Sequence, residues 1–205
     1  KKVKKFINNK NVILVREKKL LNLNFLKKLN PQIIFFPHWS YKVDEKITNN
    51  FECICFHTSP LPYGRGGSPI QNLIIRNFKK APVCAIKMTK FLDAEPIYLK
   101  KTVSLTGNLN EIFERISGEI IEMIKVLIRK KFKPKKQVGK PFIFKRVKAK
   151  ASEIKKEKKI VEIYDKIRML NAPDYPNAFI KINKIKFILT NPVLKNNTII
   201  CNAKI

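Results

Sequence analysis

The chain has 205 residues, of which 44% are apolar, and this is enough for one folded core with a small appendage. It has no run of eighteen apolar residues, which excludes a helix that spans a membrane. We therefore expect a soluble cytoplasmic protein with no membrane partner.

The strongest bulk property of the chain is its charge. Lys and Arg total 44 against 15 Asp and Glu, which gives a formal net charge of +29. The positive electrostatic potential of such a chain favours anionic substrates or partners, including nucleic acid. Lys, Asn, Ile and Phe are also the residues of A/T-rich codons, so genome composition can supply much of the same excess. Charge alone leaves both explanations open.

The first part of the chain alternates strand and helix patterns. Val12–Val15 is a short apolar run typical of a strand, and residues 20–29 carry an apolar helical face that stops at Asn30-Pro31. Ile33–Phe36 and Cys53–Phe56 follow as buried strands. This order predicts an α/β protein with a Rossmann-like, mostly parallel sheet flanked by helices.

Further helices and strands are expected towards the middle of the chain. Ser68 is a good N-cap and Pro69 a good first residue for a helix that reaches about Phe78. Val83–Met88 and Ile97–Leu99 read as strands. The run Leu109–Arg129 repeats Ile every four residues, from Ile112 to Ile128, and predicts a long amphipathic helix.

After residue 130 the composition changes to Lys, Pro, Gln and Gly, as at the exit from a domain. A basic stretch over 145–159 precedes a helix at 160–170 and paired strands over 178–189, with Asn183-Lys184 as their turn. We expect a catalytic domain over 1–140 and an accessory module over 141–205. Because the chain opens without Met in a basic stretch, we expect a truncated N-terminus that lacks the first strand.

The four cysteines form no CxxC pair, and the chain has only two histidines. Cys53 and Cys55 lie two apart in a strand and share one face. We read these cysteines as reduced thiols and expect no metal site.

His57 is the most informative single residue. It ends a buried strand and enters a loop rich in Pro and Gly that we expect to be exposed, which suits an imidazole for proton transfer at an amine. Asp93, in a turn at a strand end, is its natural partner. Both residues also have a structural interpretation: a hydrogen-bonded core histidine and a turn-forming aspartate.

Two loops add weaker signals. Gly64–Ser68 is rich in Gly and carries Arg65 beside a helix start, which suits an anionic or carbonyl oxygen, but it is not a phosphate-binding P-loop. Trp39 and Tyr41 lie beyond a strand end, where they can stack on a flat heterocycle, whereas Phe35 and Phe36 are expected to be core residues.

Together these pieces resemble the N10-formyltetrahydrofolate-dependent formyltransferases, which include enzymes that act on methionyl-tRNA and on amino sugars. The motifs that carry the resemblance are Cys55-Phe56-His57, Ser59–Pro62, Arg65-Gly66, Pro69–Gln71 and Leu92–Ile97, with Ile167–Leu170 and Tyr175–Phe179 in the accessory part. The amino-acid sequences of these motifs are most similar to those of small bacterial enzymes that resemble amino-sugar formyltransferases.

The resemblance implies the roles of the site residues. His57 and Asp93 would be catalytic, together with Cys55 at the position of the family's Asn. N10-formyltetrahydrofolate would bind to Trp39, Ser40, Tyr41, Lys42, Val43, Leu61 and Leu92. The acceptor would meet Ser59, Tyr63, Gly64, Arg65, Gly66, Gly67 and Gln71. No metal is implied.

The chain departs from the family pattern at two of these positions. Cys55 is a much weaker donor to an oxyanion than the family's Asn, and Thr58 or Ser59 is the candidate replacement. Glu95 stands where the family has Gly, so its carboxylate is expected to reshape the folate pocket.

Four functions remain open at this point. The chain length favours an amino-sugar nucleotide as the acceptor, because a complete tRNA-formylating enzyme normally carries a longer C-terminal barrel. The alternative is methionyl-tRNA, favoured by the net charge and by the basic stretch over 145–159. Formyltetrahydrofolate hydrolysis and a non-catalytic folate-binding relative are further alternatives, and a homodimer is possible.

Overall fold

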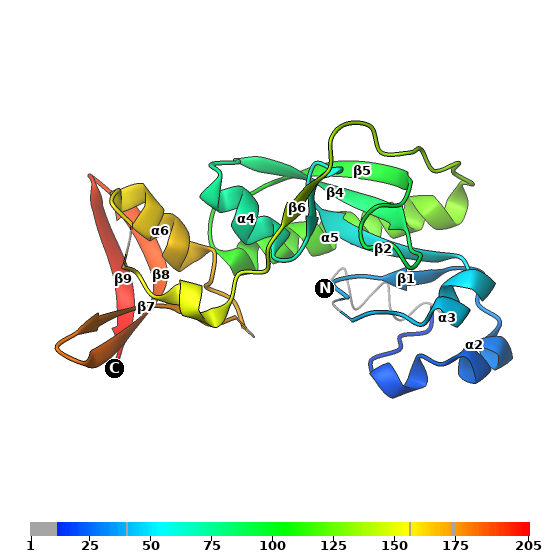
Figure 1. Cartoon of the computed structure of the whole chain (residues 1–205), viewed down its shortest axis with the longest axis horizontal. Helices are drawn as coiled ribbons and strands as arrows, with labels where there is room; N and C mark the ends of the chain where they lie inside the picture. The colour runs from blue at the N-terminus through cyan, green and yellow to red at the C-terminus, as the bar shows by residue number, and fades with distance from the viewer. Residues whose placement is uncertain (1–11, 40, 156, 174) are drawn as a thin grey trace. The chain divides into compact units, whose positions relative to one another are not determined.

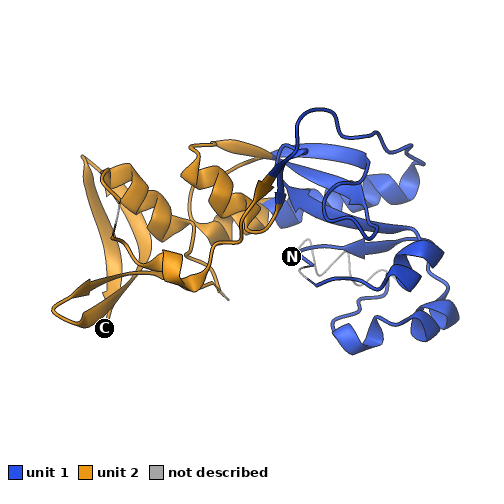
Figure 2. Cartoon of the chain, in the orientation of Figure 1, with its two compact units in different colours: residues 1–65, 82–102, 116–142 blue, residues 66–81, 103–115, 143–205 orange. Residues whose placement is uncertain are grey.

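The computed structural model describes residues 12–39, 41–155, 157–173 and 175–205, and divides them between two compact units (Figures 1 and 2). Unit 1 comprises residues 1–65, 82–102 and 116–142, and unit 2 comprises 66–81, 103–115 and 143–205. The chain therefore passes between the units several times. The single boundary expected near residue 140 stays a prediction.

A four-stranded sheet with the order β1-β2-β4-β5 organises unit 1 (Figure 1). The strands are β1 (Ile34–Phe36), β2 (Cys53–Thr58), β4 (Lys80–Lys87) and β5 (Ile97–Ser104). β1 and β2 are parallel, whereas β2 and β4 are antiparallel, with His57 opposite Cys84. The predicted α/β class is confirmed, and the sheet is mixed rather than mostly parallel.

Short helices cover the start of this sheet. α2 (Leu23–Leu29) begins where the Asn22 side chain accepts a hydrogen bond from the Phe25 N–H, and it ends at Asn30 in the left-handed conformation. α3 (Glu45–Asn50) is capped in the same way by Asp44. Their apolar faces bury a cluster with the strands, made of Leu26, Phe36, Val43, Ile47 and Cys53.

The long helix is confirmed at its predicted bounds. α5 (Leu109–Arg129) buries Ile112, Ile116, Ile120 and Ile124 along one face. The last isoleucine of the repeat, Ile128, is exposed and its neighbour Leu127 is buried, because a four-residue repeat drifts around a helix that has 3.6 residues per turn.

Three expectations about local structure are wrong. Residues 12–17 form no regular structure, and a single 3₁₀ turn, η1 (Lys18–Leu20), follows them. Ser68 occupies the predicted N-cap position of α4 (Pro69–Ile75), but in the left-handed conformation, and the expected side-chain cap is absent, since its hydroxyl accepts from the Val147 N–H. The segment after β2 is largely buried rather than exposed, since Ser59 and Leu61 are 0% and 4% accessible.

The same segment continues into a two-stranded sheet that the sequence does not predict. β3 (Tyr63–Gly66) pairs with β6 (Phe142–Phe144). Gly66 has a φ of 98°, and a Cβ atom there would lie 2.7 Å from the Phe144 carbonyl oxygen. This close approach requires glycine.

Unit 2 contains the accessory elements. A short 3₁₀ turn, η2 (Ala149–Ser152), precedes α6 (Ile160–Arg168), which packs on a three-stranded antiparallel sheet. The strands are β7 (Ala178–Ile182), β8 (Ile185–Lys195) and β9 (Thr198–Lys204). The predicted turn at Asn183-Lys184 is confirmed, and both residues take positive φ.

A buried charge pair anchors α6 within unit 2. The Arg168 guanidinium donates to the Asp165 carboxylate at 2.6 Å and to the carbonyls of Leu105 and Gly107 at 2.6 and 2.9 Å. Both side chains are almost fully buried. The guanidinium therefore satisfies a buried carboxylate and two backbone acceptors at once.

Replacing Arg168 with Ala is expected to lower the free energy of unfolding by about 3–5 kcal/mol, because the Asp165 carboxylate stays buried without its partner. Urea unfolding followed by circular dichroism measures this loss. The matched control is Arg129→Ala, at an exposed helix end, which should change stability by less than about 0.5 kcal/mol. Equal losses in the two variants would contradict this role of Arg168.

Candidate functional site

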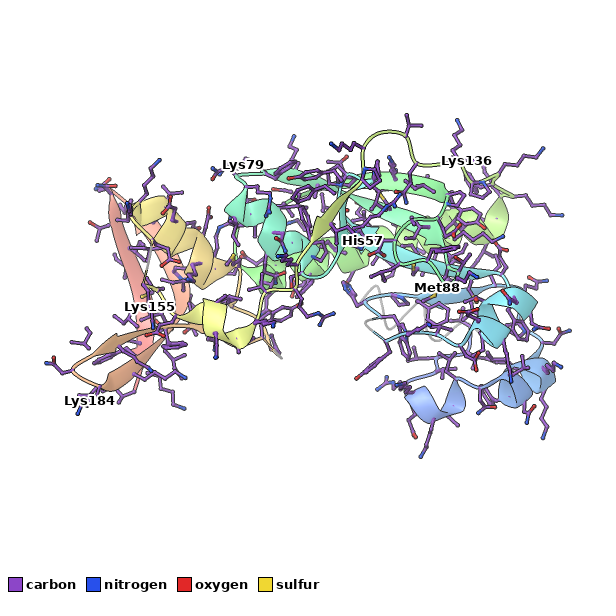
Figure 3. The ribbon with its side chains drawn as sticks, in the orientation of Figure 1. His57, Lys79, Met88, Lys136, Lys155 and Lys184 are labelled. Atoms are coloured by element: carbon purple, nitrogen blue, oxygen red, sulfur yellow. The ribbon has the colours of Figure 1, made fainter. Side chains whose placement is uncertain are left out.

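The structure brings His57 and Asp93 together inside unit 1. His57 lies near the end of β2, and Asp93 lies in the turn between β4 and β5 (Figure 3 labels His57). The imidazole Nδ1 is 3.5 Å from the Asp93 Oδ1, and both side chains are about nine-tenths buried. An imidazole and a carboxylate from two segments distant in sequence thus form one buried pair.

The other ring nitrogen of His57 is also engaged. Nε2 lies 2.7 Å from the Gly64 carbonyl oxygen, which can only accept a hydrogen bond, so Nε2 carries a hydrogen. The Asp93 carboxylate at Nδ1 is likewise an acceptor. His57 therefore has a hydrogen-bond acceptor beside each of its two ring nitrogens.

Asp93 reaches the imidazole through an unusual backbone conformation. Its φ is 51°, in the left-handed region that non-glycine residues seldom adopt. The left-handed residue of this turn is Asp93 rather than Glu95. The Glu95 carboxylate accepts from the Thr89 hydroxyl at 2.7 Å, so this side chain ties the loop together.

Cys55 lies two residues before His57 on β2, and therefore on the same face of the strand. Burial, together with the negative charge of Asp93, raises the pKa of the Cys55 thiol to about 12. The side chain packs on the apolar cluster of Leu61, Cys84, Ile86 and Ile97. Cys55 is thus a neutral thiol at the floor of the site, available only as a weak S–H donor.

Ser59 and Thr58, the candidate donors in place of the family's Asn, are both buried. Ser59 is fully buried, its carbonyl accepts from the Cys84 thiol at 3.4 Å, and its hydroxyl has no hydrogen-bond partner among the described residues.

The predicted folate loop follows β1 in unit 1, apart from Ser40, which lies outside the described residues. Trp39 packs edge-on against Phe36 and Tyr41, and its buried indole N–H has no acceptor among the described residues. Tyr41 is 57% exposed and Val43 is buried, and an open pocket is lined by Lys42, Val43, Asp44 and Glu45. Of the other predicted folate contacts, Leu61 is buried and Leu92 is exposed.

The predicted acceptor contacts divide between the two units. Tyr63, Gly64 and Arg65 belong to unit 1, where Tyr63 stacks on Phe142 with the ring centroids 5.0 Å apart. Gly66, Gly67 and Gln71 belong to unit 2. The Gln71 amide is 2% exposed and donates to the Met169 carbonyl, so it has a structural partner inside that unit.

Two further features are absent from the described residues. No group of three or more His, Cys, Asp or Glu side chains among them is placed to hold a metal ion. No helix that they form is long and apolar enough to cross a membrane.

The fold of this chain is similar to that of known formyltransferases. A solved methionyl-tRNA formyltransferase from Clostridium thermocellum is 39% identical and superimposes with a TM-score of 0.95, over 99% of this chain and 92% of that one. A 4-N formyltransferase from Francisella tularensis, 21% identical with a TM-score of 0.71 over 94% of this chain and 82% of that one, shares the fold. The α/β formyltransferase class is therefore confirmed.

Two further matches specify the family. Residues 149–205 match the family model of the C-terminal domain of methionyl-tRNA formyltransferase. The methionyl-tRNA formyltransferase of Malacoplasma penetrans is 29% identical over 205 residues, covering 95% of this chain and 64% of the relative. The chain belongs to the methionyl-tRNA formyltransferase family, and it spans less than two thirds of the length of the first curated relatives that it matches.

The raised pKa of Cys55 predicts slow alkylation. At pH 8 only about 10⁻⁴ of a thiol with a pKa of about 12 is ionised, and the thiolate is the reactive form. In the folded protein iodoacetamide should therefore label Cys55 far more slowly than in urea, as measured by peptide mass spectrometry. The half-exposed Cys201 on β9 serves as the internal control and should react first. Equal rates at Cys55 and Cys201 in the folded protein would refute this.

Proposed function

We propose that this chain transfers the formyl group of N10-formyltetrahydrofolate to the amino group of methionyl-tRNA. The observation that carries the proposal is the buried His57–Asp93 pair at the end of β2, in a chain of this family. In this proposal His57 and Asp93 have the catalytic roles that the resemblance implies, and Cys55, at the position of the family's Asn, is only a weak donor.

In the proposed reaction the acceptor nitrogen attacks the formyl carbon, and negative charge develops on the formyl oxygen. A new C–N bond forms, the bond from the formyl carbon to N10 of the folate breaks, and the proton lost by the amine passes to N10. An imidazolium held by Asp93 would stabilise the developing oxyanion electrostatically. For His57 also to relay the proton, Nε2 must exchange the Gly64 carbonyl for a reacting group.

The residues of the folate loop fit a pterin. The buried indole N–H of Trp39 is a donor that a ligand carbonyl would satisfy, since it has no acceptor among the described residues. The exposed ring of Tyr41 offers a stacking surface beside it. The folate supplies the activated formyl group, and this loop would bind and orient it.

Several observations support tRNA over an amino-sugar nucleotide as the acceptor. The methionyl-tRNA formyltransferase from Clostridium thermocellum is 39% identical and is covered over 92% of its solved chain, whereas the sugar enzyme from Francisella shares the fold at only 21% identity. Cations of the basic stretch, among them Lys145, Lys148 and Lys158, are exposed on unit 2 and suit contacts with phosphates. Hydrolysis, a non-catalytic role and a homodimer remain predictions that no observation favours.

The acceptor can be identified by incubating the protein with N10-formyltetrahydrofolate and either methionyl-tRNA or a panel of amino-sugar nucleotides. We expect formylmethionyl-tRNA to form, with an apparent affinity for tRNA that falls steeply as salt rises. Turnover of a sugar nucleotide with none of methionyl-tRNA would overturn the choice of acceptor. Release of formate without any amine would instead support hydrolysis.

The same assay tests the weak donor at position 55. Cys55→Ala should lower kcat less than about threefold because the thiol contributes little, whereas Cys55→Asn should raise kcat about tenfold or more by supplying an amide donor. His57→Ala is the reference for a lost catalytic group and should lower kcat by about 10²–10⁴. A Cys55→Ala loss as large as that of His57→Ala would show that the thiol itself is essential.

A further inference from the structure

Gln137 has no role in the site described so far. It lies in the segment after α5, which the sequence suggested was only the exit from a domain. The segment is fixed to the edge of β5, because Ile97 and Lys135 exchange two backbone hydrogen bonds of 2.8 and 2.9 Å. Lys136, the neighbour of Gln137, is labelled in Figure 3. Gln137 therefore extends from an anchored strand-like segment of unit 1.

The side-chain amide of Gln137 makes four hydrogen bonds within unit 1. Its Oε1 accepts from the Arg65 Nε and Nη2 at 3.1 and 2.8 Å. Its Nε2 donates to the carbonyl oxygens of Asp93 and Glu95 at 2.8 and 2.9 Å. The partners fix the orientation of the amide, since a guanidinium only donates and a carbonyl only accepts.

These contacts converge on the catalytic pair. Asp93 is held in a left-handed backbone conformation, with a φ of 51°. The two hydrogen bonds from Gln137 hold the backbone carbonyls at both ends of the Asp93–Glu95 turn. The side-chain carboxylate of Asp93, in the same turn, faces His57. The same amide sets the direction of the Arg65 guanidinium, a predicted acceptor contact.

We infer that Gln137 is a positioning residue of the proposed formyl-transfer site. One half of its amide fixes the turn that presents Asp93 to His57, and the other half orients Arg65 towards the acceptor. This inference rests on the proposed function for its effect on catalysis. The effect on His57 itself is independent of the acceptor.

Two substitutions of Gln137 separate the effect of its amide oxygen, which binds Arg65, from the effect of its amide nitrogen, which binds the turn. Gln137→Ala removes both, so kcat should fall by about 10–100-fold and KM for methionyl-tRNA should rise severalfold. Gln137→Glu keeps an acceptor for Arg65 but turns an oxygen towards the two carbonyls. It should therefore lower kcat to a similar degree and leave KM for the tRNA within about twofold of wild type.

A matched control lies next to Gln137 in the chain. Val138 is 89% exposed, and Val138→Ala should leave kcat and the KM values for methionyl-tRNA and N10-formyltetrahydrofolate unchanged. Circular dichroism of every variant shows that it is folded before its kinetics are compared. Losses at Val138 equal to those at Gln137 would show that the segment, rather than the amide, is responsible.

The geometry can also be tested without turnover. His38 and His57 are the only histidines in the sequence, and the His38 imidazole has its own contact, with the Ser117 hydroxyl. The ring-proton NMR signal of His57, assigned with His57→Ala, reports directly on its neighbours. In both Gln137 variants this signal should move towards its position in Asp93→Asn, while the His38 signal stays in place.

The two measurements have distinguishable outcomes. A shifted His57 signal in a protein that does not formylate methionyl-tRNA would reject the proposed acceptor and retain the positioning role. An unshifted signal in both folded Gln137 variants, or a kcat within twofold of wild type in an active enzyme, would overturn the inference.

Discussion

The constraint on which the site depends is that a buried imidazole must meet a buried carboxylate. His57 arrives on β2 and Asp93 arrives from the loop after the neighbouring strand β4, and the two side chains meet at 3.5 Å. The antiparallel pairing of β2 with β4 sets His57 opposite Cys84, so the register of two strands fixes one side of the contact. The turn at Asp93 fixes the other.

Apolar residues pack beside this pair. The imidazole contacts the Gly64 carbonyl, and Cys55, on the same face of β2, packs on an apolar cluster that includes Leu61. In such surroundings a charge is screened little by water, and an ion pair acts more strongly on a reacting group. The Cys55 thiol stays neutral there, because burial and the neighbouring Asp93 carboxylate raise its pKa.

The sequence predicts best where a signal is periodic or local. The isoleucine repeat of α5 and the Asn183-Lys184 turn depend on spacing and on turn chemistry, and both are found as predicted. The short strands β3 and β6 escape prediction because their pairing joins segments far apart in the chain. Val12–Val15 has the composition of a strand but pairs with no other strand in the described residues, and composition alone does not supply a partner.

The same distinction holds for the site. His57 and Asp93 follow apolar runs at strand ends, so the pattern indicates where they lie. Gln137 follows a run of Lys and Pro that reads as a linker, and its four hydrogen bonds involve residues about 40–70 positions away. No pattern in the neighbouring sequence predicts a structural role for a glutamine whose hydrogen-bond partners are two backbone carbonyls and a guanidinium far away in the chain.

The left-handed backbone at Asp93 also restricts which residues can replace it. Asn and Gly tolerate that conformation, whereas branched residues are strained there whatever their charge. Asn is the one residue that keeps both the backbone and the shape of the side chain while it removes the charge. A lineage that lost this carboxylate without losing the fold would therefore be expected to carry Asn at this position.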